Sequence, residues 1–224
     1  ANNLTRLARD ARLTSEQKRF FPHVLAEGYY EQQSFYLEGR IKGRSLDRFP
    51  QGVTHDPGQI KKIFSLWFEF QAKFVRQTKM TDLVFNSVFL NVAQRMQEWL
   101  ELNEKQLGRL QKVLDYWYDK FSGRQLGIGL VHGDFSIKNI MIDKQSKDVT
   151  GIIDWDLSDF FSIPLLDVLH FFVRLDAKSF QETPPAIALR LIDDREQPAA
   201  DYFKNAAEKY GYQADDWPGI VMLY

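Results

Sequence analysis

The sequence predicts an α+β fold in which helices make up most of the chain and short strands form a small region around residues 127–153. Apolar residues recur at steps of three and four over long stretches, which indicates amphipathic helices with one buried face. Short apolar runs separated by glycines and polar turns are typical of strands. With 44% hydrophobic and 14% aromatic residues, the 224-residue chain can bury a sizeable core.

The first part of the chain is expected to hold one helix and one strand. Residues 4–20 are predicted to form a short charged helix, and Pro22 breaks it because proline and the residue before it favour extended backbone. Residues 34–37, Ser-Phe-Tyr-Leu, are predicted to form a strand. Gly39 and Gly43 then mark a connector.

Three long helices are expected to follow. Asp56-Pro57 is a typical helix start, with Asp as N-cap and Pro at the first helical position. Further amphipathic stretches run over residues 84–100 and 104–121. The first of these helices has a core-facing stripe made of Ile60, Phe64, Trp67, Phe70 and Phe74.

The pattern changes after Gly127. Residues 128–131, 139–142 and 149–153 are predicted to be short strands, the last two paired like a hairpin. Pro164 begins another apolar helix, and a final helix is expected over roughly residues 199–210.

Composition excludes several classes of function. The net charge is −1, with 29 basic and 30 acidic residues, so the chain lacks the broad positive field of a nucleic-acid-binding protein. There are no cysteines, which excludes disulfides, Cys-ligated zinc and thiol catalysis and is in keeping with a cytoplasmic protein. No apolar run reaches the roughly 18–20 residues of a transmembrane helix, so we expect no membrane span.

The chemistry is concentrated in two segments, Val-His-Gly-Asp-Phe-Ser-Ile-Lys-Asn at 131–139 and Ile-Ile-Asp-Trp-Asp at 152–156. Phosphoryl transfer needs a group that orients the acceptor hydroxyl and accepts its proton, and a Mg²⁺ ion that neutralises phosphate charge. A loop carboxylate such as Asp134 suits the first task. Asn139 and Asp154 suit the second, because Mg²⁺ prefers oxygen ligands. The predicted hairpin would bring Asn139 and Asp154 together at its open end.

These motifs resemble the aminoglycoside phosphotransferase and choline kinase-like family, a branch of the protein-kinase-like fold. The family has His-Gly-Asp-x-x-x-x-Asn in its catalytic loop and Ile-Asp-Trp/Phe-Asp/Glu at its metal site. The resemblance implies ATP and Mg²⁺ as cofactors. Asp134 would be the catalytic base, His132 would brace the loop, and Asn139 and Asp154 would be Mg²⁺ ligands. Asp167, which follows Pro164, would support the backbone of the catalytic loop.

The resemblance extends upstream to the hinge strand and the Gly-Arg-Ser-Leu connector. It implies that the backbone of Glu38, Gly39, Arg40 and Ile41 binds the nucleotide.

In domain terms, the resemblance implies that residues 1–37 are a remnant of the N-terminal lobe and residues 38–55 a hinge and connector. Residues 56–224 would be the mostly helical C-terminal lobe, with its catalytic and metal-binding loops. No Gly-x-Gly-x-x-Gly and no strand lysine precede the hinge, so we expect the N-lobe to be largely missing. The chain is therefore expected to be an incomplete portion of the enzyme.

Several residues keep two interpretations. Ser136 and Lys138 either approach the transferred phosphate or are solvated loop residues, and Asp156 is either an acid near the metal or a loop cap. The remaining histidines, His23 and His55 together with His170, lack carboxylate or histidine partners at ligand spacing and are interpreted as structural or surface residues.

The favoured hypothesis is an ATP-dependent phosphotransferase that acts on a hydroxyl of a small molecule: a sugar, an amino sugar, an amino alcohol or a glycan end. The alternative is a non-catalytic nucleotide-binding or scaffold domain of the same fold, which the missing glycine loop and lysine favour. A metal-dependent hydrolase is the weakest of the three, since a dinuclear site needs more ligands than these. The sequence leaves ATP versus GTP, the acceptor and the oligomeric state open.

Overall fold

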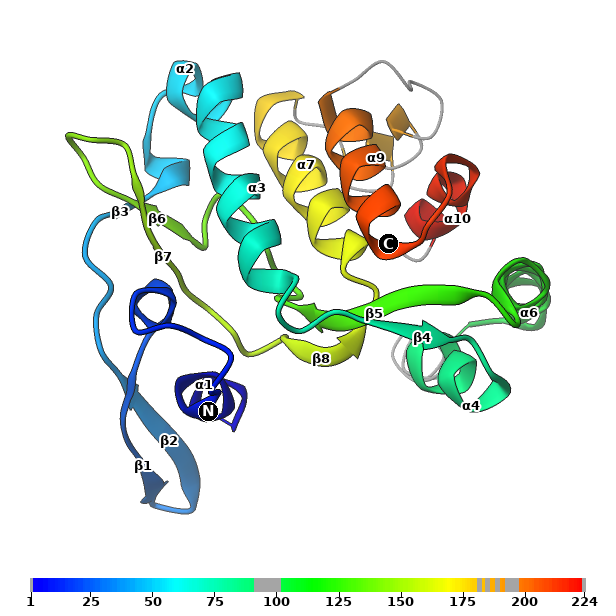
Figure 1. Cartoon of the computed structure of the whole chain (residues 1–224), viewed down its shortest axis with the longest axis horizontal. Helices are drawn as coiled ribbons and strands as arrows, with labels where there is room; N and C mark the ends of the chain where they lie inside the picture. The colour runs from blue at the N-terminus through cyan, green and yellow to red at the C-terminus, as the bar shows by residue number, and fades with distance from the viewer. Residues whose placement is uncertain are drawn as a thin grey trace.

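The computed structural model describes residues 2–90, 102–180, 183, 186, 187, 190, 191 and 198–222. It is an α+β fold, as the sequence predicts, with helices packed beside small antiparallel sheets (Figure 1). None of the described helices is both long and apolar enough to cross a membrane.

The N-terminal part differs from the prediction of one helix over residues 4–20. Helix α1 spans Asn2–Arg9, and a separate 3-10 turn, η1, spans Gln17–Phe20. The prediction was wrong because the side chain of Asp10 accepts hydrogen bonds from the backbone N–H and the guanidinium of Arg12, which bends the chain. Thr14 and Gln17 then start the next turn with reciprocal hydrogen bonds.

A two-stranded sheet follows. Strand β1 (Val24–Tyr30), which the sequence analysis did not predict, pairs antiparallel with β2 (Gln33–Glu38), which covers the predicted strand at residues 34–37. In Figure 1 this hairpin projects from the rest of the molecule.

The strands predicted around residues 127–153 belong to two three-stranded sheets. The order β3-β6-β7 joins Arg44–Ser45, Ile140–Ile142 and Val149–Ile152, and the β6–β7 pair confirms the predicted hairpin. The order β4-β5-β8 joins Arg76–Lys79, Gln125–Val131 and Asp159–Ser162. Strands β4 and β8 were not predicted, because their sequences alternate too little to indicate a strand.

The long helices follow the prediction closely. They are α3 (Pro57–Gln71), α6 (Glu104–Phe121), α7 (Leu165–Phe180) and α9 (Pro198–Tyr210). As predicted, Asp56 caps α3, accepting a hydrogen bond from Gln59 N at 2.7 Å. Of the stretch 84–100, only α4 (Asp82–Phe85) and the π-helical turn η3 (Asn86–Leu90) are described, and residues 91–100 lie outside the described residues. The shorter elements are η2 (Leu46–Arg48), α2 (Gln51–Thr54), η4 (Ala214–Asp216) and α10 (Trp217–Met222).

The core joins α3, α7 and α9, which lie together in Figure 1. Phe64 of α3 stacks on Phe172 of α7 at 5.6 Å between ring centroids and packs at a tilt against Tyr202 of α9 at 4.8 Å. Trp67, one turn along, stacks on Phe135 at 4.6 Å. The aromatic stripe of α3 therefore fixes the loop that follows β5 against the helices.

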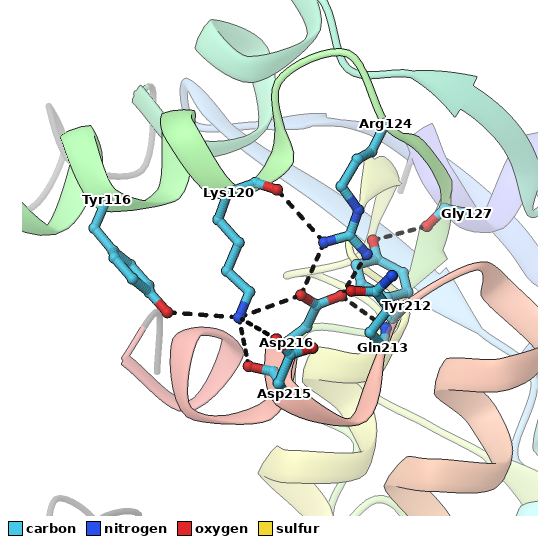
Figure 2. Close-up of polar contacts among 8 residues, drawn as sticks. All are labelled: Tyr116, Lys120, Arg124, Gly127, Tyr212, Gln213, Asp215 and Asp216. Atoms are coloured by element: carbon cyan, nitrogen blue, oxygen red, sulfur yellow. Dashed lines mark hydrogen bonds and ion pairs between the residues drawn. The ribbon is translucent and has the colours of Figure 1, made fainter.

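A polar cluster fixes the C-terminal end of the described chain to the end of α6 (Figure 2). Asp216 is fully buried and receives two hydrogen bonds from Arg124, at 2.9 and 2.7 Å, and one from Gln213 N at 2.8 Å. Lys120 lies 3.6 Å from the same carboxylate. Because both oxygens of Asp216 are satisfied, its burial is compatible with a stable fold.

Candidate active site

The candidate site is built on residues 132–139, which link β5 to β6 and are referred to here as the catalytic loop. Asp167 at the start of α7 holds the first part of this loop. Its two carboxylate oxygens accept hydrogen bonds from His132 N at 2.9 Å and Gly133 N at 3.1 Å. This contact has the form that the family resemblance implies for Asp167.

Asp167 belongs to a buried network that the sequence analysis missed. The amide of Gln71 donates to Leu130 O at 2.9 Å and lies 3.4 Å from Asp167 Oδ2, and Tyr210 OH donates to Gln71 Oε1 at 3.2 Å. Burial raises the pKa of Asp167 to about 7, although the backbone N–H groups of His132 and Gly133 act to lower it. A polar Gln71 next to the apolar stripe of α3 was the signal that could have revealed this network.

His132 braces the loop from inside the core. Its Nδ1 accepts the N–H of Asp134 at 3.3 Å, so its Nε2 carries the proton and donates to Ile153 O at 3.0 Å. The ring is fully buried, and this burial lowers the pKa of His132 to about 4. A neutral imidazole thus links the catalytic loop to the strand that leads into Asp154, through one hydrogen bond on each ring nitrogen.

Asp134 and Asn139 contact each other across the loop. The Nδ2 group of Asn139 donates to the backbone carbonyl of Asp134 at 2.9 Å and to its Oδ2 at 3.0 Å. This orientation of the amide leaves the Oδ1 atom of Asn139 as the one suited to bind a cation. The Asp134 carboxylate is itself partly exposed, with 27% of its side-chain surface accessible.

The β6–β7 hairpin brings Asp154 to its open end, where Asn139 also lies. Ile153 N donates to Asn139 O at 2.9 Å, which extends the ladder by one pair beyond Ile140 and Ile152. Asp154 then takes a left-handed backbone conformation, with φ of 65°. The predicted proximity of Asn139 and Asp154 is therefore present in the structure.

The surroundings of Asp154 are suited to a cation. Desolvation raises its pKa, and the negative charges of Asp156 and Asp134 raise it further. A bound cation would relieve that repulsion. Within the described part of the chain, no group of three or more His, Cys, Asp or Glu residues could hold a metal. One carboxylate and one amide oxygen nevertheless fit Mg²⁺, which usually keeps several waters and binds substrate phosphates.

Asp156 and Ser136 have defined environments. The hydroxyl of Tyr36 on β2 donates to Asp156, which ties the hairpin β1–β2 to the segment after Asp154. Ser136 is buried, which excludes the interpretation as a solvated residue. Lys138 is exposed, while its backbone carbonyl accepts a hydrogen bond from Ser45 Oγ at 2.6 Å. Ser45 of the connector therefore holds the end of the loop through its backbone.

A cavity of about 430 Å³ opens beside Asp154. The predicted nucleotide-binding segment Glu38, Gly39, Arg40 and Ile41 lines it, and the other lining residues are Pro22, Tyr36, Met141, Ile153 and Asp154. A larger cavity of about 690 Å³ lies between the segment around Gln17 and the outer side of α3, and no predicted site residue lines it. We place the candidate site at the smaller cavity because Asp154 and the predicted nucleotide-binding segment line it.

The structure corrects one interpretation of the sequence. His170 has no carboxylate partner at ligand spacing in the sequence, yet in the fold its Nε2 lies 2.6 Å from Asp134 Oδ1. The two residues are 36 positions apart, so sequence spacing does not reveal the contact. A signal existed, because His170 follows Asp167 by three residues and therefore shares its face of α7.

A model of the phosphotransferase enzyme family matches residues 11–210. The chain belongs to this family. The motif residues of the candidate site and all of its lining residues fall inside the matched range. No curated protein matches the chain.

Solved structures of low sequence identity share the kinase-like fold of this family member. Aminoglycoside phosphotransferase APH(3'')-Id from Streptomyces rimosus has a TM-score of 0.58 at 17% identity, over 100% of this chain and 82% of that chain. The same enzyme in complex with ADP and streptomycin has a TM-score of 0.52 at 18% identity, over 100% and 83%. An aminoglycoside-3'-phosphotransferase of type VIII has a TM-score of 0.53 at 16% identity, over 99% and 77%.

Proposed function

We propose that this phosphotransferase moves the γ-phosphate of ATP to a hydroxyl group of a small molecule. One observation carries the proposal. The partly exposed carboxylate of Asp134 lies close to Asn139 and Asp154, the pair that is suited to bind a cation. Asp154 in turn lines a cavity together with the hinge segment. Family membership supports the reaction type.

Asp134 is proposed as the base. In phosphoryl transfer the loop Asp orients the acceptor hydroxyl and accepts its proton. His132 and Asp167 do not contact the acceptor in this scheme. They hold the backbone on either side of Gly133, which sets where the Asp134 carboxylate lies.

Asn139 and Asp154 are proposed to hold Mg²⁺. The ion would neutralise charge on the phosphates when the nucleotide is bound. The repulsion among Asp134, Asp154 and Asp156 supports this assignment, because the charge of one Mg²⁺ would offset it. Asp156, held by Tyr36, remains a candidate for a supporting acid at this site.

The nucleotide is proposed to occupy the cavity of about 430 Å³, with its base against the backbone of Glu38, Gly39, Arg40 and Ile41. In this arrangement residues 1–37 represent the N-lobe side, residues 38–55 the hinge and connector, and residues 56–224 the C-lobe. The cavity supports this division, since Tyr36 and the hinge contribute one part of its lining and Met141, Ile153 and Asp154 contribute another.

The ligands of solved structures with this fold indicate which acceptors to test. Structures of the fold have been solved with streptomycin or kanamycin, which are small molecules with hydroxyl groups. Sugars, amino sugars and amino alcohols are therefore the acceptors to test first. The scaffold alternative predicts no transfer to any of them.

The test is release of ADP or GDP by the protein with Mg²⁺ and ATP or GTP, against streptomycin, kanamycin, choline and simple sugars. Asp134→Asn should lower kcat by about 10²–10⁴-fold and leave the KM for nucleotide nearly unchanged, as for loss of a general base. Asp148→Asn, an exposed carboxylate at the far end of the same hairpin, is the matched control.

A second arm tests the cation site. Asp154→Ala should abolish turnover, and Asn139→Ala should raise the Mg²⁺ concentration that half-maximal activity requires. A wild-type protein that transfers phosphate to no acceptor would reject the proposal. Turnover that survives chelation of Mg²⁺ would reject the cation site alone.

A further inference from the structure

Helix α7 contacts the catalytic loop with two side chains from one face. Asp167 binds the backbone N–H groups of His132 and Gly133, and His170 lies one turn further along, with Nε2 2.6 Å from Asp134 Oδ1. The His170 side chain is 15% exposed. The same helix thus sets the backbone of the loop and reaches the side chain of the proposed base.

The proton in the short contact belongs to His170. A carboxylate can only accept, so Nε2–H of His170 donates to Oδ1 of Asp134. On the other oxygen, Oδ2 accepts from Asn139 Nδ2 at 3.0 Å. One donor on each oxygen fixes the rotation of the carboxylate, and a second lone pair on each oxygen is left for an acceptor hydroxyl.

We propose that His170 is a positioning residue, which fixes the Asp134 carboxylate in the orientation that receives the acceptor hydroxyl. This proposal rests on the proposed function, since it gives Asp134 the role of base. It adds a residue that acts through Asp134 and not on the substrate.

A histidine suits this task better than a permanent cation. Burial lowers the pKa of His170, and Asp134 acts to raise it. The other charged or titratable groups that interact with the ring are Arg174, whose Nε lies 3.4 Å from Nε2, and the neutral His132. A neutral ring at pH 7 orients the carboxylate without cancelling its charge, so the base keeps its affinity for a proton.

The kinetic test compares His170→Ala with His170→Gln. The Ala variant should lower kcat by about 10- to 100-fold with little change in the KM for ATP, because a misplaced base slows transfer but not nucleotide binding. The Gln variant places an amide N–H near the position of Nε2 and should recover most of kcat. His55→Gln is the matched control, and melting temperatures show whether each variant folds.

A loss of kcat that Gln does not recover, in variants with native melting temperatures, would overturn the proposal. So would a His170→Ala variant that is as active as wild type. A readout independent of turnover is the NMR titration of His170. Its pKa should fall in Asp134→Asn, because the carboxylate that favours the charged ring is gone. An unchanged pKa would overturn the contact, whereas a wild type without transferase activity but with this shift would reject only the proposed function.

Discussion

At the residue scale, Gly133 is the position in the catalytic loop that tolerates no side chain. Its φ is 84°, and a Cβ built there would lie 2.3 Å from Leu157 O. The clash is with backbone, so a rotamer change cannot relieve it. Gly133 lies between His132 and Asp134, and the close approach to Leu157 therefore also fixes the two residues of the proposed site.

We expect Gly133→Ala to lower the free energy of unfolding by at least about 2 kcal/mol, because strain in the left-handed region adds to the clash. Chemical denaturation measures the loss. Gly123→Ala is the matched control, since Gly123 also has a positive φ, 75°, but has no atom within 4 Å of the built Cβ. Equal losses in the two variants would show that the contact with Leu157 adds nothing.

His132 gives the fold a dependence on pH with a defined sign. The pKa of the ring is about 4 in the folded state against its usual 6.5, and the cause is burial. Below pH 6.5 the His132 ring of the unfolded chain binds a proton, whereas the buried ring of the folded chain stays neutral until the pH approaches 4. The stability contribution of His132 is therefore complete above pH 6.5 and is lost progressively as the pH falls toward 4, by about 3 kcal/mol in total.

The measurement is the free energy of unfolding between pH 7 and 4.5 for wild type and for His132→Gln, which should lose much of this slope. Asp167, with its raised pKa, acts in the opposite direction, since its burial costs stability as the pH rises from about 4 to 7. Its contribution is common to both proteins and cancels in the difference. NMR detection of a protonated His132 at pH 5.5 would contradict this account.

At the element scale, the polar cluster of Figure 2 contains two neighbouring carboxylates, Asp215 and Asp216, whose burial predicts very different contributions to stability. Asp216→Asn leaves Arg124, three quarters buried, without its carboxylate partner. We expect a loss of about 3 kcal/mol in the free energy of unfolding, as for one partner removed from a buried ion pair. Asp215→Asn should cost under about 1 kcal/mol, because the Asp215 side chain is 71% exposed. Similar losses would contradict the assignment of Asp216 as the buried anchor.

Elements with strong local signals were the ones that sequence could predict. Helix α3 has a capping Asp56 followed by Pro57, and α6 begins at Asn103 with a complete capping box, so their starts are encoded locally. The end of α1 was missed because it depends on a side-chain turn at Asp10 that competes with helix. Strands β4 and β8 owe their extended form to pairing with β5, which is information from distant parts of the chain.

The candidate site divides in the same way. Asp134, Asn139 and Asp154 could be found because their chemistry is carried by short motifs and their proximity follows from one hairpin. His170 and Gln71 were missed because packing between α3, α7 and the loop brings them to the site. Their local signals, the spacing of His170 from Asp167 and the place of Gln71 beside the apolar stripe, do not name the distant partner.

At the scale of the whole molecule, the cavity of about 430 Å³ lies between two parts of the chain that are distant in sequence. Tyr36 and the hinge come from one side, and Met141, Ile153 and Asp154 come from the other. The hydrogen bond from Tyr36 to Asp156 is a side-chain link between the hairpin β1–β2 and the C-terminal part. A ligand in this cavity would therefore couple the two sides.

We expect ATP with Mg²⁺ to slow hydrogen–deuterium exchange in residues 22–41 and 139–156 together, because a bound ligand stabilises every element that it contacts. Helix α6 does not line the cavity and serves as the internal control. Asp154→Ala should weaken the protection given by ATP with Mg²⁺ to the level given by ATP with a chelator. Protection confined to the segment around Gln17 and α3 would instead place the nucleotide in the larger cavity, and that result would overturn the assignment of the hinge.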